Sequence, residues 1–185
     1  MSIQRSNANE DDDGFSLIEV IVVVVVLAIL GSLIAMILVS TLRTQENVSA
    51  QTTATTRGQL VASEIERAMR NAVAFAITDG GATLKVNTSL DDELKCQGFT
   101  FGSNGVRMAV TGFPGPDSSV WPVWQDHIAQ SGATDFFEET GTQGVRYSFE
   151  ATTTDASEPA TTAPVHFTGD AYMRNAAAGT MTPCW

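Results

Sequence analysis

A long uninterrupted apolar run near the N-terminus constrains this chain more than any other feature. From Val20 to Val39 nearly every residue is Val, Ile, Leu, Ala or Met, and none is charged. A helix of roughly 20 such residues is about 30 Å long, which matches the hydrocarbon core of a bilayer. Because lipid offers the backbone no hydrogen-bond partner, such a run must be helical in a membrane. The sequence therefore predicts a membrane-spanning helix.

A short polar leader, residues 1–14, precedes the apolar segment. Its one positive charge, Arg5, stands against four acidic residues, and one minus four gives a net charge of −3. Cytoplasmic flanks usually carry an excess of Lys and Arg, so this leader weakens the usual orientation signal. The run itself is too long for the apolar region of a cleaved secretory signal, and no small-x-small cleavage site follows it.

One carboxylate, Glu19, lies in the otherwise apolar segment that begins at Phe15. A lone acidic side chain in hydrocarbon costs about 2.5–3.5 kcal/mol, and more in some treatments. On position alone, two interpretations are open. Glu19 either marks the edge of a span that starts at Val20, or it is a functional residue with a partner.

The neighbours of Glu19 add a motif. Gly14-Phe15-Ser16-Leu17-Ile18-Glu19, followed by the apolar run, resembles the processing site of type IV prepilins and type II secretion pseudopilins. In that motif Gly, Phe, a hydroxyl residue, two aliphatic residues and Glu stand in fixed register before a long apolar helix. The resemblance covers the leader and the apolar helix, whereas the rest of the chain carries no pilin motif.

The resemblance implies a processing and assembly route. A prepilin peptidase would cut between Gly14 and Phe15, and the new Phe15 amine would be N-methylated. Glu19 would then form a salt bridge with the Phe15 amine of a neighbouring subunit, because a buried charge is tolerated when it is paired. The implied partners are other pilin subunits, the prepilin peptidase, the inner-membrane assembly platform and, before assembly, the lipid bilayer. The chain would be a single-pass membrane protein with its head outside the cytoplasm, and later part of an extracellular pilus.

A second helical pattern follows the apolar segment 15–42. Over residues 43–78 we expect the helix to continue into the head, with apolar residues at spacings of three and four forming one packing face: Val61, Ile65, Ala68, Met69, Ala72 and Ala76. The cluster Thr52–Thr56 and Gly58 are poor helix formers, which allows a kink or a frayed turn there. Asp79-Gly80-Gly81 is expected to end the helix, because glycine suits a helix C-terminus.

The remaining residues, 79–185, have the short alternating runs of a β-rich head. Residues 82–86 alternate, and Ser103-Asn104-Gly105 separates two strand-like runs, which is a strong hairpin signal. Residues 145–149 and 165–168 alternate as half-buried strands do, residues 121–128 suit a short helix or packed loop, and residues 152–163 suit an exposed loop. The predicted fold class is α+β, with an antiparallel sheet packed on the second half of the long helix.

The chain has two cysteines, Cys96 and Cys184. They are too far apart for a CxxC redox or zinc motif. In an extracytoplasmic head a disulfide between them is expected, and disulfide-bonded C-terminal regions are also familiar in the resembled family. Closing a loop of about ninety residues stabilises a fold by about 4–5 kcal/mol in the entropy model. The alternative is two buried thiols.

Other candidate sites in the head have a simpler interpretation. The net charge of −11 argues against general nucleic-acid binding. We interpret His127 and His166 as structural or surface residues, and Asp91-Asp92-Glu93 as a solvated turn rather than a calcium site. We interpret Trp121, Trp124 and Trp185 as core residues rather than an adhesive surface. Asn87-Thr88-Ser89 is a weak match to a glycosylation sequon. No catalytic, metal-binding or cofactor-binding pattern is found in the sequence.

Three function classes follow. The leading prediction is a structural subunit of a type IV pilus or related filament, more like a minor pilin in its size, Thr-rich loops and Arg-containing helix 64–70. The alternative is a single-pass membrane-anchored binding module that never polymerises and uses the apolar helix only as an anchor. A tethered enzyme has no supporting motif.

Overall fold

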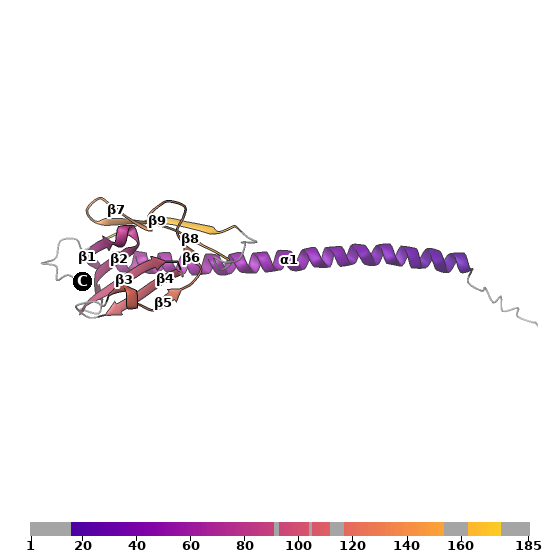
Figure 1. Cartoon of the computed structure of the whole chain (residues 1–185), viewed down its shortest axis with the longest axis horizontal. Coiled ribbons are helices and arrows are strands. Elements are labelled where there is room, and N and C mark those ends of the chain that lie inside the picture. The colour runs from indigo at the N-terminus through magenta and orange to yellow at the C-terminus, as the bar shows by residue number, and fades with distance from the viewer. Residues whose placement is uncertain (1–15, 91–92, 104, 112–116, 154–162, 175–185) are drawn as a thin grey trace, which may run out of the picture. The chain divides into compact units, whose positions relative to one another are not determined.

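The computed structural model describes residues 16–90, 93–103, 105–111, 117–153 and 163–174. The chain divides into two compact units, Met1–Gln45 and Glu46–Trp185. Helix α1, Leu17–Arg70, contributes residues to both units (Figure 1). The boundary between the units falls close to Leu42, where the apolar segment was predicted to end.

The second unit is a β-rich head, as predicted, and the fold class is α+β. After α1 the described part of the head contains nine strands and two short 3-10 turns: β1 (Ala72–Thr78), η1 (Asp79–Gly81), β2 (Thr83–Leu90), β3 (Glu93–Gly102), β4 (Gly105–Thr111), η2 (Ser118–Val120), β5 (Val123–Gln125), β6 (Ile128–Ala129), β7 (Phe137–Thr140), β8 (Gly144–Ala151) and β9 (Val165–Tyr172).

The strands form two antiparallel sheets where one was predicted. The first has the order β1-β2-β3-β4-β5, and in the second β8 pairs with β9 on one side and with β6 and β7 on the other. The chain changes sheets between β5 and β6, at a tight turn in which His127 adopts a φ of 56°. Residues 126 and 127 form a bend between the two strands, and β6 pairs with β8 instead of extending the first sheet.

Helix α1 ends earlier than predicted. It stops at Arg70, whereas the sequence pattern extended it to residue 78. The Asn71 side chain Nδ2 donates to the Arg67 carbonyl at 2.9 Å and occupies the end of the helix. The next residues form β1, with Phe75 opposite Val86 and Ile77 opposite Leu84 on β2. Aromatic and β-branched residues at every second position favour a strand, and the helical spacing of the alanines had hidden this pattern.

The glycines that were predicted to end the helix instead lie in a hairpin turn. Asp79, Gly80 and Gly81 have φ values of 55°, 63° and 86°, and they form the turn between β1 and β2. A reversal of this kind needs positive φ, which glycine adopts without steric cost.

Four strand predictions are confirmed and one segment differs. The alternating residues 82–86 fall in β2 apart from Ala82. The predicted hairpin is β3–β4, with Gly102 opposite Gly105, and β8 buries alternate residues as expected. Residues 165–168 open β9. Residues 121–128, predicted as a short helix or packed loop, instead contain β5 and the start of β6. Most of the predicted exposed loop, 154–162, lies outside the described residues.

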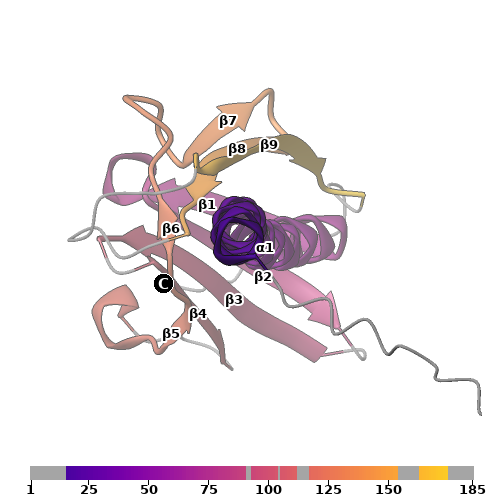
Figure 2. The ribbon, with the colours of Figure 1, turned by 90° about the vertical axis from the view of Figure 1, so that its right-hand side faces the viewer.

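The helix packs on the head through the face that the sequence predicted, extended toward the N-terminus. Val61, Ile65, Ala68 and Met69 are buried, and the same face continues to Gly58 and Ala54. These residues contact both sheets, which lie on two sides of the second half of α1 (Figure 2). The apolar stripe therefore fastens the helix to the head.

The Thr-rich stretch does not break the helix. Thr52, Thr53, Thr55 and Thr56 each donate their hydroxyl to the carbonyl four residues earlier, at 2.8–3.0 Å. Such bonds satisfy the hydroxyl within the helix and leave the backbone hydrogen bonds in place. Gly58 has a packing reason, because a Cβ there would lie 2.0 Å from Cε2 of Phe167 on β9.

Aromatic rings join the two sheets into one core. Phe101 on β3 stacks on Phe136 at 4.5 Å between ring centroids and meets Phe149 of β8 at 5.5 Å. Phe149 in turn stacks on Phe167 of β9 at 5.3 Å. Aromatic pairs at these separations stabilise a core beyond their buried area.

Two carboxylates flank the buried face of α1, and each binds a different sheet. Glu64 Oε1 accepts a hydrogen bond from Gln97 Nε2 of β3 at 2.8 Å. Glu66 Oε1 accepts one from the hydroxyl of Tyr147 on β8, also at 2.8 Å. Hydrogen bonds to charged groups are the stronger ones, so these contacts fix the rotation of the helix between the sheets.

We expect Tyr147→Phe to destabilise the head by about 1.5–3 kcal/mol, because it removes a buried hydrogen bond to a carboxylate. Burial, followed by the nearby Glu66, raises the pKa of Tyr147 well above its usual range. A raised pKa keeps the folded state protonated while the unfolded chain ionises near pH 10, so this contribution is lost above about pH 10. Urea unfolding of the full chain in detergent, at pH 7 and in the alkaline range, measures both effects.

Tyr172→Phe is the matched control. Tyr172 is 51 % exposed on β9, so its hydroxyl is expected to contribute less than about 0.5 kcal/mol. Equal losses in the two variants would contradict the role given to the Tyr147–Glu66 bond.

Candidate functional site: an apolar helix with a charge near each end

The first described turn of α1 contains the predicted assembly residue. The Ser16 carbonyl accepts hydrogen bonds from the backbone N–H groups of Glu19 at 2.9 Å and Val20 at 3.2 Å. Ser16 thus stands at the N-cap and Glu19 three residues later, which is the spacing of a capping box. Gly14 and Phe15, the predicted cleavage and methylation residues, lie outside the described residues.

The Glu19 side chain does not complete that capping box. Its carboxylate makes no hydrogen bond or ion pair with any residue that the structure describes. The positive end of the helix dipole favours an acidic side chain here by about 0.3–1 kcal/mol. That is less than the cost of about 2.5–3.5 kcal/mol for a carboxylate in hydrocarbon. The helix dipole alone therefore does not offset the free-energy cost of burying the Glu19 carboxylate in hydrocarbon.

The helix after Glu19 is apolar on every side. Its large side chains range from 47 % exposed at Val23 to 74 % exposed at Met36. It is the one described helix that is long and apolar enough to cross a membrane. A helix that is apolar all round needs apolar surroundings on all sides, either lipid or other helices.

The few hydroxyl groups along this helix are mostly satisfied within it. Ser32 donates to the Ile29 carbonyl at 2.8 Å, and Thr41 donates to the Ile37 carbonyl at 2.9 Å. Hydroxyls bonded in this way are tolerated in an apolar environment. The charged groups are therefore the costly ones, and between Glu19 and Glu46 the sequence holds a single one, Arg43.

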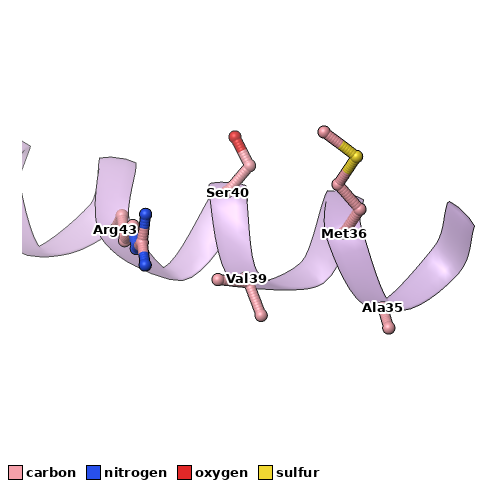
Figure 3. A pocket seen from close by; sticks show the side chains of 5 residues that line it. All are labelled: Ala35, Met36, Val39, Ser40 and Arg43. Atoms are coloured by element: carbon pink, nitrogen blue, oxygen red, sulfur yellow. The ribbon is translucent and has the colours of Figure 1, made fainter. Parts of the chain in front are cut away.

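Arg43 borders a shallow hollow on the helix surface. Four other residues line it, Ala35, Met36, Val39 and Ser40 (Figure 3). Sequence reasoning did not single out Arg43, although the first charge after an apolar run is a readable signal.

The contacts of His166 with other described residues do not form a catalytic relay. His166 Nδ1 lies 3.0 Å from Ser131 Oγ and 3.4 Å from Glu150 Oε2. In a nucleophile–base–acid relay the nucleophile and the acid bind different ring nitrogens. Here both contacts fall on the same nitrogen, of a side chain that is 63 % exposed.

The second histidine lies at the sheet-changing turn. The carbonyl of His127 accepts the backbone N–H of Thr152 at 2.8 Å. Its neighbour Asp126 forms an ion pair of 3.2 Å with Arg57 of α1. These contacts give the turn a structural role.

The structure does not bring Trp121 and Trp124 together on one surface. Trp121 is 4 % exposed and covers Gly98, where a Cβ would meet its ring at 1.9 Å. Trp124 packs against Phe99, the next residue along β3. Successive residues of a strand face opposite sides of the sheet, so the two rings lie on different faces. Trp185 lies outside the described residues.

The remaining sequence candidates are buried or undescribed. Asn87 and Thr88 of the sequon are 1 % and 0 % exposed on β2, so the folded head does not present this sequon. Asp91 and Asp92 lie outside the described residues, and Glu93 begins β3. Among the described residues no group of three acidic, His or Cys side chains is placed to hold a metal ion.

Cys96 lies on β3, is 6 % exposed and is disulfide-bonded. Cys184 lies outside the described residues, so the pairing of the two stays a prediction.

Comparison with known proteins adds no identification, since no protein family, curated protein or solved structure matches this chain.

Proposed function

We propose that this chain is a subunit of a type IV pilus or related filament, cut between Gly14 and Phe15 and assembled through the apolar part of α1. The observation that carries the proposal is Glu19. Its carboxylate lies at the start of the apolar part of α1 and has no partner among the described residues.

A positive group from a second chain would offset the free-energy cost of burying the Glu19 carboxylate. Cleavage after Gly14 creates such a group, the Phe15 amine, at the very start of the helix. In an apolar bundle this amine and the Glu19 carboxylate of a neighbour would neutralise each other. Because the amine exists only after cleavage, processing would act as a switch for assembly. A subunit shifted along the bundle would leave both charges unpaired, so the pair would also set the axial register.

The apolar helix suits both stages of this route. Before assembly, lipid would cover the side chains that are exposed in a single chain. After assembly, the same surface would contact the helices of neighbouring subunits. The head, fastened to α1 through Val61, Ile65 and Met69, would be displayed on the filament, outside the cytoplasm. The proposal assigns the chain no catalytic role.

The mature N-terminus tests the proposal. We expect mass spectrometry of the protein from its native membrane to show a chain that begins at N-methylated Phe15. A chain that still begins at Met1, or that is cut elsewhere, would reject the proposal and favour the alternative, a membrane-anchored binding module that does not polymerise. A Gly14→Val variant, expressed beside the wild type, is expected to remain uncut and shows that the peptidase reads this junction.

A further inference from the structure

The spacing of the two charges that border the apolar helix sets where each lies in a bilayer. Glu19 and Arg43 are 24 positions apart, which corresponds to about 36 Å of helix. The hydrocarbon core is about 30 Å thick, and about 40–45 Å with the headgroup layers included. A helix that spans the bilayer with Glu19 in one headgroup layer therefore places Arg43 in the opposite one.

Arg43 differs from the other arginines of α1. Its guanidinium makes no ion pair or hydrogen bond with any described residue. Arg57, Arg67 and Arg70 are all paired with carboxylates, at 3.2, 3.7 and 3.4 Å. A guanidinium presents five donors in a planar fork that matches a phosphate group. Arg43 is thus available for an anion at the depth where phospholipid phosphates lie.

The surface beside Arg43 matches the rest of a phospholipid. Ala35, Met36 and Val39 line the hollow on the N-terminal side of Arg43, and Ser40 lies between them and Arg43 along the helix (Figure 3). Thr41 and Thr44 donate their hydroxyls to the helix backbone, whereas the Ser40 hydroxyl has no hydrogen bond to a described residue. The hollow is therefore bordered by two side chains that can donate hydrogen bonds, Ser40 and Arg43, and by apolar side chains N-terminal to them.

We propose that Arg43, assisted by Ser40, binds the phosphate of a membrane phospholipid, with the glycerol and upper acyl chain lying along Val39 and Ala35. This inference rests on the membrane-embedded stage of the proposed function. It does not require cleavage or filament assembly. The competing partner for Arg43 is the Glu19 carboxylate of a second copy.

The test uses the full-length chain in vesicles of phosphatidylcholine and phosphatidylglycerol. After mild detergent extraction, native mass spectrometry counts the phospholipid molecules that stay bound. We expect Arg43→Gln to lower phospholipid retention about fivefold, the effect of one Arg near an anionic membrane surface. Arg43→Lys keeps the positive charge but lacks the planar guanidinium. Its phospholipid retention is expected to lie between that of Arg43→Gln and that of the wild type. Nuclear dipolar coupling between the arginine guanidinium carbon and lipid phosphorus provides a second measurement, and Arg43→Gln should reduce it.

Arg57→Gln is the matched control, because Arg57 lies on the same helix but is paired with Asp126. It should retain phospholipid like the wild type. Equal retention and equal coupling in Arg43→Gln and wild type would overturn the lipid site while leaving the filament proposal intact. So would a loss of chain dimers in Arg43→Gln with unchanged phospholipid retention, which would assign Arg43 to a second copy. Failure of the wild-type chain to integrate into vesicles would overturn the lipid site together with the membrane anchor.

Discussion

Glu19→Ala is expected to reduce the incorporation of this subunit into filaments by about a hundredfold or more. Removing one partner of a buried ion pair costs about 3–5 kcal/mol, because the other charge stays buried and uncompensated. Each 1.4 kcal/mol is about a tenfold change in an equilibrium constant. The group left unpaired would be the Phe15 amine of the neighbouring subunit. Immunoblotting of sheared filaments against the membrane fraction measures the ratio.

Two controls separate assembly from other effects of this substitution. Glu46→Ala removes the next acidic residue of the same helix, which lies beyond the apolar segment, and should leave incorporation unchanged. Mass spectrometry of the Glu19→Ala chain should still show cleavage after Gly14, so that loss of assembly is not loss of processing. If Glu19→Ala subunits were cut normally and entered filaments as efficiently as wild type, the register role of Glu19 would be wrong.

Gly58→Val is expected to destabilise the head by on the order of 3 kcal/mol, since overpacking a filled core costs about 1–3 kcal/mol and occasionally more. The Cβ of any larger residue would lie 2.0 Å from the ring of Phe167, which is itself stacked on Phe149. The ring must move, and the contact between β9 and α1 must open. Urea unfolding of the full chain, followed by tryptophan fluorescence, gives the free energy of unfolding.

Gly31 supplies a matched glycine in the same helix. A Cβ at Gly31 meets nothing within 4 Å, so Gly31→Val should leave the unfolding of the head unchanged. The double variant Gly58→Val with Phe167→Ala should lose less stability than the sum of the two single changes, because the added methyl groups occupy the space of the removed ring. Strict additivity would show that the cost at Gly58 comes from elsewhere.

The sequence predicted the membrane-length helix and much of the head, for reasons that are local. The Val20–Val39 run demands a helix in any apolar surrounding, whatever the head does. The β3–β4 hairpin and the alternation along β8 also follow from turn chemistry and a period of two. The end of α1 was misplaced because Ala72 and Ala76 continue a helical spacing while Val73, Phe75 and Ile77 alternate. Only pairing with β2 selects the strand.

What the sequence alone determined is the chemistry of the N-terminal segment: its length, its apolar surface and the register of Glu19 with the Gly14–Phe15 junction. These depend on residues close together in the chain. The tertiary structure decided what distant residues do to one another. It packed the Phe167 ring on Gly58, joined Tyr147 to Glu66 by a hydrogen bond, and divided the strands between two sheets. Tyr147 and Glu66 are 81 positions apart, and Gly58 and Phe167 are 167 − 58 = 109 apart, so no local periodicity encodes these contacts.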